Sequence, residues 1–144
     1  MLHMNRFGVL LGMTIAFAMP CFADQATSAD ALPPAVKKRV EASIAKLRHP
    51  EERALAHDWS PAKQVAETLC SPFALKQWKK MDPTADRMVL GDDGEKSLEL
   101  KDGGSIAGHG QVRHKDGWTS FRFTCTVDAR DGSVKSFQHT DENK

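Results

Sequence analysis

Two serines, each followed three positions later by a lysine, are the first residues in this sequence whose spacing could support catalysis. Ser43 precedes Lys46, and Ser60 precedes Lys63. On a helix this spacing puts an amine beside a hydroxyl, as in serine acyl-enzymes, where the lysine helps to remove the serine proton. Those enzymes also need further motifs and a larger scaffold than 144 residues provide. We therefore interpret Ser60 as a helix cap and Lys46 as a solvated side chain, and assign no catalytic residue.

Histidine and acidic residues could supply metal ligands. His109 and His114 are five positions apart. Side chains of a strand alternate between its faces, so a regular strand cannot direct both at one ion. The acidic residues in the second half lack the ligand spacing of a calcium loop; they are Asp92, Asp93, Glu95 and Asp102. We expect no metal site and no cofactor.

The first 23 residues have the features of a secretory signal peptide. Arg6 precedes an apolar run, and the segment ends with Cys21, Phe22 and Ala23. The run is shorter than the roughly 20 residues that a membrane-spanning helix needs. We expect cleavage after Ala23, a periplasmic location and no stable membrane insertion of the mature protein. Acylation of Cys21 is the alternative.

The charge balance restricts the class of partner. The chain has 20 Lys and Arg residues and 19 Asp and Glu residues, and cleavage after residue 23 removes only Arg6 among them. A mature chain with no net charge lacks the basic excess of a nucleic-acid-binding protein. We therefore expect no nucleic-acid partner.

Two cysteines, Cys70 and Cys125, remain after cleavage. An even pair in an exported chain is typical of a disulfide, and no Cys-x-x-Cys motif indicates a redox centre. The sequence therefore predicts one Cys70–Cys125 bond.

Residues 24–32 are small and polar and are expected to form a flexible leader, followed by a single domain at residues 33–144. The first part of this domain shows helical periodicity, with apolar residues at Val36, Val40, Ile44 and Leu47. We expect this helix to close at Arg48 and His49. Proline-marked starts predict further helices, one through about His57, one from Ser60 and one ending near Met81.

The second part of the domain has the alternating pattern of β-strands. Phe121, Phe123 and Cys125 alternate with polar residues, and Asp116-Gly117 favours a two-residue hairpin turn. Val134 and Phe137 are three apart, so a bulge or an exposed apolar residue is required there. Helices followed by antiparallel strands predict an α+β fold, with N-terminal helices packed on a C-terminal antiparallel sheet and one disulfide.

The hairpin also predicts a candidate partner-binding surface. With a turn at Asp116-Gly117, Lys115 pairs with Trp118, Arg113 with Ser120, and His109 with Thr124. Arg122 joins them on the face opposite Phe121. The predicted site therefore comprises His109, Arg113, Lys115, Trp118 and Arg122. A Trp surrounded by cations offers stacking area and donors for a carboxylate, a phosphate or an acidic partner surface. The alternative is a solvated sheet face.

The chain also resembles a known family. The strand Trp118-Thr-Ser-Phe-Arg-Phe-Thr-Cys-Thr-Val127, followed by Val134 and Ser136-Phe137, is similar to the exported proteobacterial family catalogued as domain of unknown function 930. Cys70 and Asp86-Arg87 belong to the same pattern, which covers residues 70–138. The resemblance implies export and a cross-linked α+β fold, and it supplies no catalytic residue.

These observations together favour a small exported, non-catalytic binding or accessory protein, such as the minor subunit of an envelope complex. An envelope protein or an anionic ligand is the expected partner. Two alternatives stay open: an inhibitor of an envelope hydrolase that presents the loop Lys115 to Trp118, and a small hydrolase whose site the sequence does not reveal.

Overall fold

The structure, a computed structural model, describes residues 31–92, 94 and 96–142. The expected signal peptide at residues 1–23 and most of the expected leader at 24–32 lie outside the described residues. None of the helices within the described ranges is long and apolar enough to cross a membrane.

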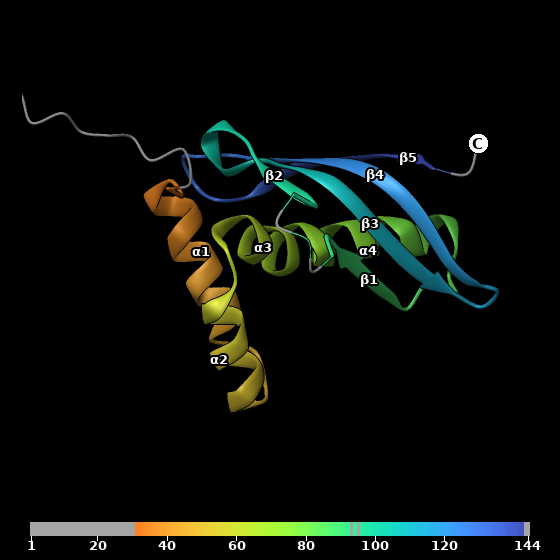
Figure 1. The fold of residues 1–144 in the computed structure, drawn as a ribbon, viewed down its shortest axis with the longest axis horizontal. Helices are drawn as coiled ribbons and strands as arrows, with labels where there is room; N and C mark the ends of the chain where they lie inside the picture. The colour runs from red at the N-terminus through yellow and green to blue at the C-terminus, as the bar shows by residue number, and fades with distance from the viewer. Residues whose placement is uncertain (1–30, 93, 95, 143–144) are drawn as a thin grey trace, which may run out of the picture.

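Four α-helices make up the first half of the domain (Figure 1). They are α1 (Pro34–Ile44), α2 (Pro50–Asp58), α3 (Pro61–Val65) and α4 (Ser71–Met81). Each has a proline within its first two positions, where the missing N–H costs no hydrogen bond. The expected helix starts are therefore confirmed.

Helix α1 ends earlier than its apolar pattern predicts. It buries Val36, Val40 and Ile44 but stops at Ile44 rather than at Arg48 and His49. The N–H groups of Lys46 and Leu47 bond three residues back, and the Arg53 guanidinium of α2 donates to the Leu47 carbonyl at 2.6 Å. This side chain satisfies a backbone acceptor at the end of α1, so the chain can turn into α2.

Helices α3 and α4 are joined by one π-helical turn, η1 (Ala66–Cys70). The N–H of Ser71 donates to the Ala66 carbonyl, five residues back. Pro72 has no N–H for the Thr68 carbonyl, and its ring would crowd that carbonyl in a regular α-helix. The wider turn relieves this conflict.

A five-stranded antiparallel sheet forms the second half. Its strands are β1 (Arg87–Leu90), β2 (Leu98–Leu100), β3 (Ile106–His114), β4 (Gly117–Val127) and β5 (Val134–Asp141). The order is β1-β3-β4-β5, with β2 also paired to β3. Helices α3 and α4 run along one face of this sheet (Figure 1), where Val112, Phe121 and Cys125 are fully buried. The α+β fold is therefore confirmed.

The β3–β4 hairpin differs from its predicted register. Trp118 pairs with Arg113 instead of Lys115, and His109 pairs with Arg122 instead of Thr124. The turn residues are thus Lys115 and Asp116, and Gly117 follows with a φ of 123°. A hydrogen bond of 3.1 Å from the Lys115 N–H to Thr84 Oγ1 fixes the turn in this position. The shift is two positions, so the paired side chains keep their predicted faces, while Lys115 moves from the predicted face into the turn.

Strand β5 contains the irregularity that its sequence requires. Thr126 pairs with Ser136 and Val127 pairs with Val134, so the register shifts and Lys135 has no partner. This bulge brings Phe137 opposite Cys125 on the inner face, where Phe137 is 8% exposed.

Candidate functional site

The predicted disulfide is present between Cys70 and Cys125. Its Cα atoms are 6.1 Å apart and both side chains are fully buried. The bond joins η1 to the inner face of β4, so it ties the helical half to the centre of the sheet.

The outer face of the sheet carries most of the predicted partner-binding residues. His109, Arg113, Trp118 and Arg122 all lie on the face opposite Phe121, whereas Lys115 lies in the turn. Arg87 of β1 pairs with Arg113, so Arg87, Arg113 and Trp118 form one row across three strands. Sequence reasoning missed Arg87 because its neighbour in the row is 26 positions away.

This row is held in place from the sheet edge. Arg113 donates two hydrogen bonds, of 2.8 and 2.9 Å, to the carboxylate of Asp86. The guanidinium lies 5.8 Å from the centre of the Trp118 ring, within cation–π range. The hydrogen bond lowers the pKa of Asp86 and raises the pKa of Arg113. Trp118 nevertheless remains 47% exposed.

A second group on the outer face is built around Glu142. Its carboxylate contacts His109 Nδ1 at 2.5 Å and Arg122 Nε at 3.6 Å. His109 and Glu142 also line a hollow of about 540 Å³, together with Ser120 and Lys63. The cations of the predicted site are therefore partly neutralised by Asp86 and Glu142, two acids that the sequence did not connect with it.

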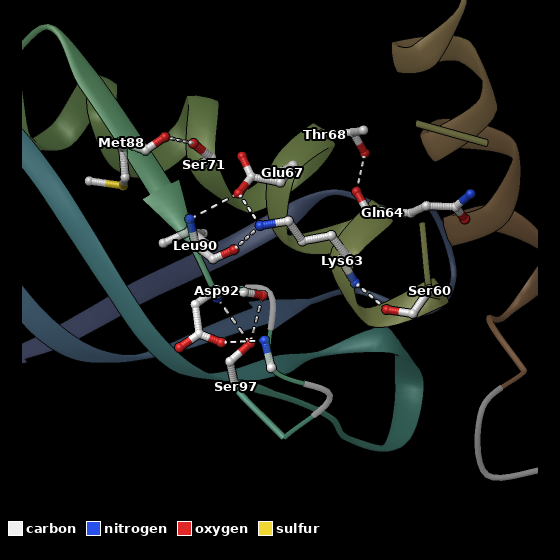
Figure 2. Close-up of polar contacts among 11 residues, drawn as sticks. Ser60, Lys63, Gln64, Glu67, Thr68, Ser71, Met88, Leu90, Asp92 and Ser97 are labelled. Carbon is white, nitrogen blue, oxygen red and sulfur yellow. Dashed lines mark hydrogen bonds and ion pairs between the residues drawn. The ribbon is translucent and has the colours of Figure 1, made fainter. Parts of the chain in front are cut away.

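The edge of the sheet beside this hollow is covered by side chains of α3, η1 and α4 (Figure 2). Lys63 donates to the Leu90 carbonyl at 2.7 Å, and Glu67 accepts from the Leu90 N–H at 2.9 Å. Lys63 and Glu67 also bond to each other at 3.0 Å, while Ser71 donates to the Met88 carbonyl. These side chains take the place of a neighbouring strand, which protects an edge that could otherwise pair with another chain.

The Ser60 and Lys63 pair has structural partners in this arrangement. Ser60 accepts a hydrogen bond from the Lys63 N–H at 3.3 Å and so caps α3, as predicted. The Lys63 amine bonds to Glu67 and Leu90.

A chain of polar contacts links the hairpin to the end of α4. His114 Nδ1 lies 3.2 Å from Asp82 Oδ2, and His114 Nε2 lies 2.7 Å from Thr119 Oγ1. The Thr84 hydroxyl donates to Asp82 and lowers its pKa. The order carboxylate, imidazole, hydroxyl is that of a hydrolase triad, which also needs oxyanion donors and a substrate cavity. Thr119 does not line the hollow of about 540 Å³ that His109 and Glu142 line.

The two strand histidines lie on opposite faces, as their spacing predicts. His109 contacts Glu142 on the outer face, while His114 contacts Asp82 and Thr119. Within the described residues, no group of three or more His, Cys, Asp or Glu side chains could hold a metal ion. The site therefore offers stacking and charge-assisted hydrogen bonding.

No family model, curated protein or solved structure matches the chain.

Proposed function

We propose that the protein is a small exported, non-catalytic binding or accessory protein that recognises an acidic envelope partner through the outer face of its sheet. The observation that carries this proposal is the row of Arg87, Arg113 and Trp118. Tryptophan and arginine are the residues most enriched at the energetic centres of protein interfaces. Here the Trp is exposed, and its Arg neighbour is fixed before any partner arrives, which reduces the entropy lost on binding.

The charges of the row favour an acidic partner. Arg113 is paired with Asp86, but Arg87 makes no ion pair with any other described residue. Arg122 keeps 69% of its side chain exposed beside Glu142. A carboxylate or phosphate of the partner can therefore approach Arg87 and Arg122 without displacing the Asp86–Arg113 pair.

Export is supported by the first 23 residues, by the buried disulfide and by the resemblance of residues 70–138 to an exported family. The disulfide needs an oxidising compartment to form and persist. If the captured partner is an envelope hydrolase and the protein lowers its activity, the result would favour the alternative of an inhibitor that presents the exposed turn between β3 and β4.

Affinity capture from a periplasmic extract tests the proposal. The mature chain, Trp118→Ala and Arg87→Glu would each be immobilised, and the bound partner quantified by mass spectrometry. Arg87 is the better charge-reversal site because Arg122→Glu would also place two acids together at Glu142. We expect Trp118→Ala to weaken the complex at least tenfold, since truncated interface centres cost about 2 kcal/mol or more.

Two matched controls lie far from the sheet. Leu55→Ala removes a side chain that is 58% exposed on α2, and Arg48→Glu reverses an exposed charge between α1 and α2. Both controls should bind like the parent protein. A partner retained equally by Trp118→Ala and Arg87→Glu would show that the outer face is only a solvated surface.

A further inference from the structure

A second hollow, a groove, shares no lining residue with the proposed recognition surface. It has a volume of about 670 Å³ and lies between α1, the η1–α4 segment and the turn that joins β4 to β5. Apolar side chains from three separate segments line it: Ala42 of α1, Leu69 of η1, Phe73 of α4 and Val134 of β5. This volume falls within the range of small-molecule binding sites, which are mostly apolar with a few polar groups.

The rim of the groove is cationic. Lys38, Arg39 and Lys46 of the α1 region line it, against one acid, Asp131. The Asp131 carboxylate accepts the Ser133 N–H at 2.8 Å, so it is engaged within its own turn. Within the described residues, Lys38 and Lys46 form no ion pair. Two exposed amines thus border an apolar floor without an anionic partner.

Arg39 is oriented at one end of the groove. Its Nε donates to the Asp131 carbonyl at 3.1 Å, which leaves both Nη groups for a bidentate acceptor. The β4–β5 turn is packed closely here, since a Cβ on Gly132 would lie 2.9 Å from the Ala35 carbonyl oxygen. The backbone of this turn and of α1 therefore forms the end wall of the groove.

We propose that this groove binds a monoacyl anion, a molecule with one flexible hydrocarbon chain and one carboxylate. The chain would cover Leu69, Phe73 and Val134, and the carboxylate would bond to Arg39 with Lys38 or Lys46 nearby. A neutral hydrocarbon ligand would leave the cations without a partner. An inorganic anion would leave the apolar floor uncovered. The groove and the outer face lie on different elements, so this proposal does not depend on the proposed function.

Titration of the isotope-labelled mature protein with decanoate, followed by amide chemical shifts, tests the proposal. We expect saturable one-to-one binding, with the largest shifts at Ser43, Leu69 and Ser133. Decyltrimethylammonium carries the same chain with the opposite charge and should bind at least tenfold more weakly. Equal binding of the two ligands, or shifts confined to other residues, would overturn the proposal.

Matched variants locate the ligand. Lys38→Glu/Lys46→Glu should weaken decanoate binding at least tenfold. Its control is Lys37→Glu, which reverses an exposed charge of α1 that does not line the groove, and it should change decanoate binding less than twofold. Ala42→Trp should fill the groove and abolish binding, while Ala54→Trp on α2 should not. If Lys37→Glu weakened decanoate binding as much as Lys38→Glu/Lys46→Glu does, the protein would attract anions only through its surface cations in general, contrary to the proposal.

Two other occupants would be revealed by the same protein. A concentration-dependent dimer that decanoate does not dissociate would assign the groove to a second copy. The second occupant is the chain's own leader, whose residues 24–30 include Asp24 and Asp30. If deletion of residues 24–30 makes decanoate bind more than tenfold tighter than it binds the mature chain, the groove belongs to the leader. Either result would replace the external ligand that we propose.

Discussion

Loss of the Cys70–Cys125 bond should remove a large part of the stability of the domain. The two residues are 55 positions apart, and both are fully buried. Closing a loop of that size in the unfolded chain corresponds to about 4 kcal/mol in the chain-entropy description. Typical domains have a total stability of about 5–15 kcal/mol, so the change would be visible in any unfolding experiment.

Urea unfolding can separate the contribution of the covalent link from that of the buried sulfur atoms. The samples are the oxidised protein, the reduced protein and the double variant Cys70→Ala/Cys125→Ala. Reduction breaks only the covalent link, so it should lower the free energy of unfolding by about 4 kcal/mol. The double variant also removes two buried sulfur atoms and should be at least as unstable as the reduced protein. Thiol titration of the denatured, unreduced protein should find no free sulfhydryl in the mature chain. A reduced protein within about 1 kcal/mol of the oxidised one would refute the loop-entropy argument.

Two further predictions concern the edge of the sheet and acid stability. Glu67→Ala leaves the Leu90 N–H without its acceptor and removes one of the two acceptors of the Lys63 amine, so it should cost about 1–3 kcal/mol in urea unfolding and speed amide exchange at Leu90. Glu99→Ala, which removes an exposed pair with Lys101, is its control and should cost less than about 1 kcal/mol; equal losses would show that the edge contacts add nothing. Hydrogen bonds from Arg113 and Arg130 lower the folded pKa values of Asp86 and Asp128, so the stability they contribute is present above about pH 4 and is lost as the pH falls. Asp86→Asn should flatten this loss, as measured by urea midpoints between pH 5 and pH 2; a slope identical to that of the parent protein would contradict the assignment.

The sequence was most informative where a local signal determines a local structure. Ser60-Pro61 predicted the start of α3, and alternation along β4 predicted which residues face the core. The same alternation placed Trp118 and Arg122 correctly on the outer face. The hairpin register was wrong because a distant contact, from the Lys115 N–H to Thr84, determines where the chain turns.

The candidate sites were less predictable because their residues come from distant segments. Asp86 and Glu142, which neutralise the predicted cations, are separated from Arg113 and Arg122 by 27 and 20 positions. The groove draws on three segments, and Lys46, one of its two lysines, was interpreted from the sequence as a solvated side chain. The packing of α1 against η1 and the β4–β5 turn makes both lysines neighbours of an apolar floor.

The π-helical turn η1 connects these separate features. Glu67 reaches the β1 edge, Leu69 lines the groove, and Cys70 forms the disulfide with β4. In a regular α-helix successive residues are 100° apart, and the extra residue in η1 changes the directions in which these side chains leave the helix. Pro72 provides the physical reason for that extra residue, since it cannot donate the hydrogen bond of an α-turn. The π-helical turn next to Pro72 therefore places three neighbouring side chains against the sheet edge, the groove and the disulfide partner in β4.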